Sequence, residues 1–126
     1  MNPRDRARYV GAAPTWLSQT FNIFEVTNPM GGVDLYNSGA LEEGVYDIFA
    51  GVGISAAALG QYFVLGIFTP TPALGTYLAV PFSPAAGYYE IYRGGLWVTK
   101  DYSVRLHCYY AWTGTIGGIC GAIRRV

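Results

Sequence analysis

Residues 46–55 read Tyr-Asp-Ile-Phe-Ala-Gly-Val-Gly-Ile-Ser. Apolar side chains occupy every second position from Tyr46 to Ile54, and the positions between them hold an aspartate, a phenylalanine and two glycines. A period of two residues is that of a β-strand, whose side chains point alternately to its two faces. The same period returns in residues 103–112, where Val, Leu, Cys, Tyr and Trp alternate with more polar residues. Both segments therefore predict strands that turn one face toward a core.

Strand signals recur along the rest of the chain and are separated by turn residues, such as Asn-Pro-Met-Gly-Gly at 28–32. Short strands spaced by about 8 to 12 residues are typical of a β-sandwich or barrel. No segment has the period of a long amphipathic helix, and neither a repeat nor a linker divides the chain. We therefore predict an all-β fold of about eight strands. The predicted strands are residues 20–26, 33–36, 45–55, 61–68, 76–82, 88–93, 103–112 and 119–126.

The stretch from Ile48 to Phe68 is uncharged and long enough for a membrane helix. It contains four glycines and a glutamine, and its first part alternates as a strand does. We therefore expect strands here and no membrane span. Because residues 1–8 are charged and no apolar segment follows them before Thr15, we also expect no secretory signal and synthesis in a cytoplasm.

The 126 residues are 52% apolar and 13% charged, with a formal net charge of zero. A chain of this length can form one domain whose core needs neither disulfides nor a metal. Cys108 and Cys120 lack the spacing of metal ligands and are too few for a disulfide framework, so we expect two free, buried thiols. A neutral, weakly charged surface tends to associate and does not suit nucleic acid. We expect an oligomer that binds no nucleic acid.

The zero net charge hides a segregation along the chain. Residues 1–8 hold three arginines and one aspartate, whereas residues 9–92 hold six acidic residues and no Lys or Arg. Residues 93–126 hold five basic residues and one aspartate. Chain termini are often polar for no functional reason. The alternative is an arginine-rich N-terminal arm that contacts an acidic partner surface through Arg4, Arg6 and Arg8.

No constellation of residues predicts catalysis. Gly51-Val52-Gly53 follows a strand as in a dinucleotide-binding turn, but neither a helix pattern nor an acidic residue at the required spacing follows. His107 is the only histidine, so a metal site or catalytic triad would depend on one residue; we expect it at the surface or in an interface. The carboxylates are dispersed. We predict that the chain is not an enzyme and holds no cofactor or metal.

The eleven tyrosines and three tryptophans allow two interpretations. In the first interpretation, they fill a core and a subunit interface, where a large ring with a polar tip is favoured. Alternatively, they form a sugar-stacking face made by Tyr88, Tyr89, Tyr92, Tyr109, Tyr110 and Trp112. Phe49 favours the interface, because it points away from the predicted core, on the same side of the strand as Gly51 and Gly53. A large ring on that face needs a cover.

Two segments resemble a known family. Residues 43–49, Glu-Gly-Val-Tyr-Asp-Ile-Phe, and residues 91–106, which begin Ile-Tyr-Arg-Gly-Gly, are similar to strands of the trimeric jelly rolls of the tumour necrosis factor and complement globular-head type. The resemblance covers about residues 16–126 and implies a single antiparallel jelly-roll sandwich after an extended N-terminal arm, residues 1–15. It also implies that aromatic side chains pack around a three-fold axis. The axial residues by this resemblance are Phe49, Tyr92 and either Ile119 or Cys120, while Asp47 replaces a usual apolar axial residue.

Family members that act as secreted ligands carry features that this sequence lacks, among them an Asn-x-Ser/Thr sequon. The compact trimer is also similar to decoration proteins on the outside of tailed-phage capsids and to the knobs of phage fibres. We therefore expect a virion structural protein, made in a host cytoplasm, that binds the major capsid protein as a homotrimer and stabilises the shell. Arg4, Arg6 and Arg8 would supply charged contacts, and Trp16 or Leu17 an apolar anchor. The alternative is a trimeric glycan- or receptor-binding knob of a phage fibre.

Overall fold

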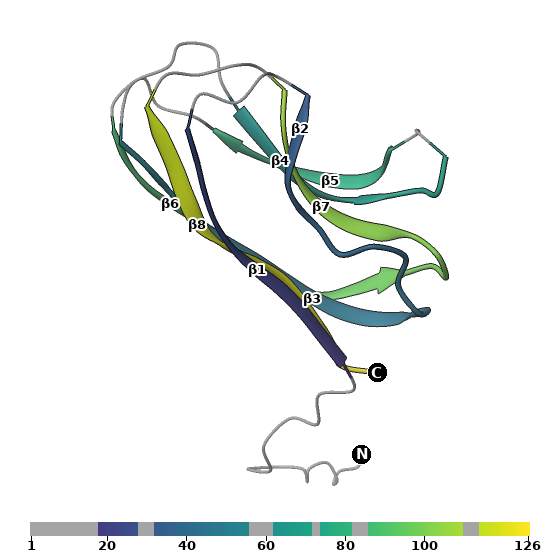
Figure 1. Cartoon of the computed structure of the whole chain (residues 1–126). Helices are drawn as coiled ribbons and strands as arrows, with labels where there is room; N and C mark the ends of the chain where they lie inside the picture. Colours follow the sequence, from purple (N-terminus) through teal and green to yellow (C-terminus); the bar gives the residue numbers. More distant parts are fainter. Residues whose placement is uncertain (1–17, 28–31, 56–61, 72–73, 82–85, 110–113) are drawn as a thin grey trace, which may run out of the picture.

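The computed structural model describes residues 18–27, 32–55, 62–71, 74–81, 86–109 and 114–126. The predicted arm and its contact residues Arg4, Arg6, Arg8, Trp16 and Leu17 lie outside these ranges. Eight strands occupy most of the described part of the chain (Figure 1). They are β1 (Ser18–Thr27), β2 (Val33–Asn37), β3 (Gly44–Ile54), β4 (Tyr62–Phe68), β5 (Leu74–Pro81), β6 (Gly87–Val98), β7 (Ser103–Cys108) and β8 (Thr115–Arg124).

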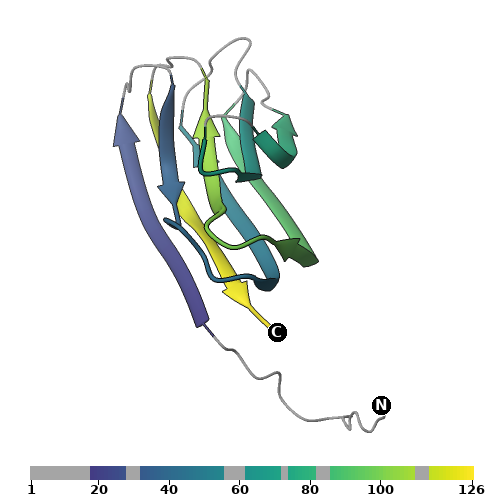
Figure 2. The same cartoon turned by 90° about the vertical axis from the view of Figure 1, so that its right-hand side faces the viewer.

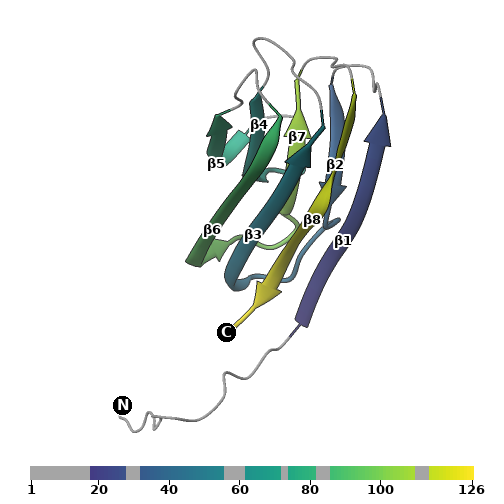
Figure 3. The ribbon, with the colours of Figure 1, turned by 90° about the vertical axis from the view of Figure 1, so that its left-hand side faces the viewer.

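The strands form two four-stranded sheets that pack against each other. The first sheet has the order β1-β8-β3-β6, seen face-on in Figure 3, and the second has the order β2-β7-β4-β5, on the side shown in Figure 2. Every pairing is antiparallel. The predicted all-β sandwich of about eight strands is confirmed.

The alternation that predicted the fold places the core as expected. In β3, Tyr46, Ile48, Ala50, Val52 and Ile54 are all buried between the sheets. In β7, Val104, Leu106 and Cys108 are fully buried, and the polar residues between them face outward. Neither cysteine forms a disulfide in the structure, and both thiols are buried, as predicted. In β4, Phe63, Val64 and Leu65 are all buried, which agrees with a strand that is covered on both faces.

Several strand ends differ from the prediction. The strand predicted at 88–93 continues to Val98 as β6, because two glycines form a bulge inside the strand and do not end it. The predicted final strand begins at Thr115 and not at Ile119. The end of the predicted strand 103–112 lies outside the described residues beyond Tyr109. Ile48–Phe68 contributes to β3 and β4, and the described residues include no helix long and apolar enough to cross a membrane.

The bulge in β6 lies opposite the part of β3 that pairs with the last residues of β8. Tyr46 pairs with Leu96 and Ile48 pairs with Arg93, so Asp47 alone faces Gly94 and Gly95. Gly95 has a φ of 69°, a left-handed conformation that favours glycine. Its backbone N–H points at the Asp47 carboxylate, at 3.1 Å.

Candidate functional site

The outer face of the β1-β8-β3-β6 sheet carries a row of aromatic side chains. The register places Phe21 opposite Gly121, Gly121 opposite Phe49, and Phe49 opposite Tyr92. Residues opposite each other in neighbouring strands share a face of the sheet. One aromatic row, interrupted only by a glycine, therefore crosses all four strands.

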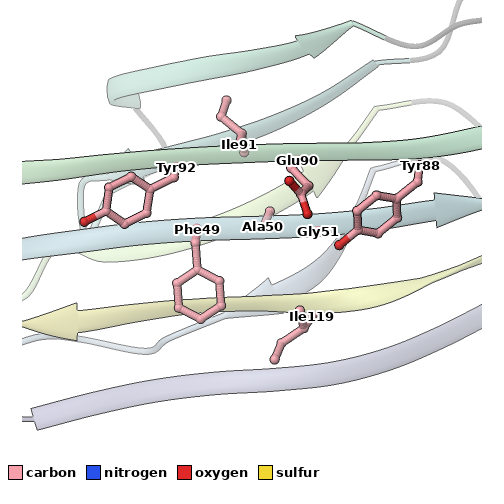
Figure 4. Close-up of a pocket in the computed structure, with 8 residues that line it drawn as sticks. All are labelled: Phe49, Ala50, Gly51, Tyr88, Glu90, Ile91, Tyr92 and Ile119. Carbon is pink, nitrogen blue, oxygen red and sulfur yellow. The ribbon is translucent and has the colours of Figure 1, made fainter.

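Glycines on this face make room for the rings. A Cβ atom on Gly121 would lie 2.6 Å from Cζ of Phe49 and 2.8 Å from Cβ of Phe21, closer than real side chains approach. A Cβ on Gly51 would collide with the hydroxyl of Tyr88. Figure 4 shows Phe49 reaching from β3 toward β8, and Tyr88 reaching from β6 across β3. The rings therefore lie along the sheet and form a broad, low surface.

Large apolar groups on this face are open to solvent in the single chain. Phe49, Tyr88, Tyr92 and Ile119 line a hollow of about 460 Å³, with Glu90 as its one charged lining residue (Figure 4). A contiguous apolar surface of this kind marks a site of association. The exposed fractions are 55% for Phe21, 74% for Ile23, 61% for Tyr88 and 58% for Tyr92. We call these residues, together with Phe49 and Ile119, the aromatic face.

The structure brings three of the four predicted interface residues together. Phe49, Tyr92 and Ile119 all lie on the aromatic face. Cys120 does not: its side chain is fully buried between the sheets, because consecutive residues of β8 point to opposite faces. Burial raises the pKa of its thiol to about 12, so the thiol is neutral. The prediction that placed Cys120 at the interface is therefore corrected: Cys120 belongs to the core, and of the two alternatives only Ile119 lies on the aromatic face.

Asp47 is connected to the aromatic face. This buried residue accepts hydrogen bonds from the N–H of Gly95 and the hydroxyl of Tyr92, and it forms an ion pair with Arg125. Burial by itself would raise the pKa of the Asp47 carboxyl. The hydrogen bonds from Gly95, Tyr92 and Arg125, together with the charge of Arg125, lower this pKa below its ordinary value. Asp47 therefore anchors the Tyr92 ring and the end of β8 to the β6 bulge.

Replacing Asp47 with asparagine should lower the free energy of unfolding by about 2 kcal/mol at pH 7, since hydrogen bonds to a charged group are lost. A carboxyl whose pKa is lowered by folding stabilises the protein above its unfolded pKa of about 3.9, and this stabilisation is lost as the pH falls through the folded value. Urea unfolding should therefore show a gap between wild type and Asp47→Asn that closes below about pH 4. The exposed Glu42→Gln serves as control. An equal gap at pH 7 and at strongly acidic pH would contradict this role.

The outer face of the other sheet holds a polar cluster that the sequence did not reveal. Asp34 of β2 lies directly opposite His107 of β7, and their side chains are joined at 2.7 Å. Arg105 forms an ion pair with the same carboxylate at 3.4 Å. Asp34 and His107 are 73 positions apart in the sequence, so only the strand register brings them together. His107, predicted at the surface or in an interface, is thus half-buried and has a carboxylate partner.

The predicted sugar-stacking face is not assembled as one surface. Tyr88 and Tyr92 lie on the outer face of one sheet, whereas Tyr109 contacts His107 outside the other sheet. Tyr89 packs against the core instead of facing outward. The prediction placed these residues together because their spacing in sequence does not show that β6 and β7 belong to different sheets. Tyr110 and Trp112 lie outside the described residues.

In the described part of the chain, no group of three or more His, Cys, Asp or Glu side chains is placed to hold a metal ion. Neither the models of known protein families nor the curated proteins compared with this chain give a match. The function is therefore inferred from the residues and their arrangement.

Proposed function

We propose that this chain is a virion structural protein, a homotrimer that binds the major capsid protein on the outer surface of a capsid and stabilises the shell. The observation that carries the proposal is the aromatic face. Its rings are exposed in the single chain, and an apolar surface of this kind is typical of contact with another apolar protein surface. A second and a third copy of the same face supply that surface.

The strand pairing supports a jelly-roll topology. The chain pairs β1 with β8, β2 with β7, β3 with β6 and β4 with β5. This nested order results when one long antiparallel ribbon is wrapped into two sheets, and the wrapping also brings β3 beside β8 and β4 beside β7. Jelly rolls of eight strands are common in viral capsid proteins. Fold alone does not establish function, so the topology supports the proposal without carrying it.

Three-fold symmetry would strengthen binding to the shell even if each single arm binds weakly. A trimer presents three N-terminal arms, each with Arg4, Arg6 and Arg8, to three equivalent sites on the shell. Once one arm is bound, the others bind at a high effective concentration. We place the protein on the capsid surface of the virion, with synthesis in the host cytoplasm.

Rate-zonal sedimentation of a native lysate tests this proposal. We expect the protein to sediment with very large particles and to be released by salt, because its arm contacts are electrostatic. Deletion of residues 1–13 should abolish this co-sedimentation and leave a free trimer of about 37 kDa. Wild-type protein found only as a free trimer would reject the capsid role. Unchanged capsid binding by the deletion variant would reject the role of the arm.

The second candidate function is a ligand-binding knob of a phage fibre. The observation that favours it is the polar cluster of Asp34, Arg105 and His107, which lies on the sheet opposite the aromatic face and so stays open when that face is covered.

A further inference from the structure

We propose that the hollow outside β2 and β7 binds a neutral pyranose sugar. This inference gives the second candidate function a site and a ligand class, and it does not depend on the capsid role. The hollow has a volume of about 650 Å³, within the range of small-molecule sites. Asp34, Arg105 and His107 line it together with Thr69 and Thr71, and Phe68 and Tyr109 supply aromatic rings.

The strand register builds the polar part of the site. Asp34 and His107 are direct partners across β2 and β7, and Arg105 lies two residues before His107 on the same face of β7. Gly66 of β4 is opposite Arg105, so no side chain at that position crowds the guanidinium. The three side chains retain between 21% and 32% of their surface exposed. They are therefore held by the sheet and still accessible to a ligand.

Neighbouring groups fix each of these side chains in place. The Nδ1–H of His107 donates to Asp34 at 2.7 Å, and the His107 ring meets the Tyr109 ring edge-on at 4.7 Å between centroids. Arg105 donates from Nε to the hydroxyl of Ser103 at 3.0 Å. The guanidinium carbon of Arg105 lies 5.3 Å from the centre of the Phe68 ring, in the geometry of a cation–π contact. Because the groups are ordered before binding, a ligand would lose little affinity to ordering them.

The hydrogen-bonding capacity that remains matches adjacent hydroxyl groups. A carboxylate only accepts hydrogen bonds, so Nδ1 of His107 donates to Asp34 and Nε2 is left for a ligand. Arg105 has five N–H groups, of which the described bonds use two. The site therefore presents acceptor oxygens on Asp34 beside donors on Arg105, with Nε2 of His107 next to them. A sugar hydroxyl both donates and accepts, so two neighbouring hydroxyls can satisfy this alternating set.

The charge balance selects a neutral ligand. The cluster places the carboxylate of Asp34 beside the guanidinium of Arg105, and these two opposite charges offset each other. A phosphate or an acidic sugar would gain from Arg105 but would be repelled by Asp34 at close range. The Phe68 and Tyr109 rings line the same hollow and offer apolar surface to the C–H groups of a pyranose.

The single histidine of the chain makes the test direct, because its ring signals in NMR can belong only to this site. Purified full-length protein is titrated separately with methyl mannoside, methyl galactoside, methyl glucoside and N-acetylglucosamine. We expect at least one of these neutral sugars to shift the His107 ring signals in a saturable manner. No shift with any of them, or a shift with glucuronate or inorganic phosphate alone, would overturn the proposal.

A matched pair of variants assigns the binding to the cluster. Arg105→Gln should weaken the affinity for the bound sugar at least tenfold, a change of about 1.4 kcal/mol. Arg93→Gln removes the same charge from an exposed position in the other sheet and should leave the affinity unchanged. Equal affinities for both variants would overturn the assignment. If Arg105→Gln does not fold, the wild-type titration still decides the proposal. The capsid role is not involved in either measurement, since no shell is present.

Discussion

Replacing Phe49 with aspartate should convert the proposed trimer of about 41 kDa into monomers or insoluble protein. The ring of Phe49 lies over Gly121, next to Tyr92 and beside the apolar hollow of the aromatic face. In a symmetric trimer the substitution places three carboxylates in an interface without counter-charges. An unpaired buried charge costs about 3–5 kcal/mol for each substitution, so three of them strongly disfavour the assembled state. Sedimentation equilibrium of the purified protein measures the change in mass.

Two control variants separate the loss of the interface from a general effect of charge. Phe49→Leu keeps an apolar side chain at the same position and should remain a trimer. Asn37→Asp adds the same charge at an exposed position of β2, in the other sheet, and should also remain a trimer. A soluble Phe49→Asp protein with the mass of the wild-type trimer would show that the aromatic face is not the interface.

Gly118→Ala should destabilise the fold by about 3 kcal/mol or more. Gly118 lies inside β8, and a Cβ atom there would overlap the carbonyl oxygen of Gly51 and lie 3.1 Å from Cα of Val52. Both of these atoms belong to the backbone of β3, so relief requires the two strands to separate. The pairing of β3 with β8 connects the two halves of the first sheet, and its loss would affect the whole sandwich. Urea unfolding followed by tryptophan fluorescence gives the free energy.

Gly53→Ala is the matched control for this substitution. Gly53 lies in the paired strand, where a new Cβ would meet the carbonyl oxygen of Gly117 and Cδ1 of Tyr88, each at the ordinary distance of 3.8 Å. We expect a change within about 1 kcal/mol. Equal unfolding midpoints for Gly118→Ala and Gly53→Ala would mean that the close approach of β8 to β3 does not limit stability.

The sequence predicts the faces of single strands well. The alternation from Tyr46 to Ile54 correctly assigned the core side of β3, and it left Phe49 as a ring without cover. This works because the period of two residues is local and any strand with one buried face must obey it. In β8 the glycine-rich sequence carries a weaker alternation. Because the alternation is weak, the sequence does not show which of Ile119 and Cys120 points to the outer face.

The polar cluster could not be predicted in the same way. Asp34 and His107 meet only through the register of β2 with β7, and that register depends on the whole topology. The β6 bulge was missed for a related reason. The predicted strand stops at Arg93, before Gly94-Gly95, because the sequence does not show that the N–H of Gly95 will donate to Asp47, 48 positions away.

The same bulge affects how copies of the chain can join. β6 forms an edge of the first sheet, and an edge strand offers unpaired N–H and C=O groups to any extended segment that approaches it. The left-handed Gly95 interrupts this row of groups, so a strand from another molecule cannot pair along the full length of β6. Growth of the sheet from molecule to molecule, the route to open-ended fibrils, is therefore obstructed at this edge, while association through the aromatic face stays open.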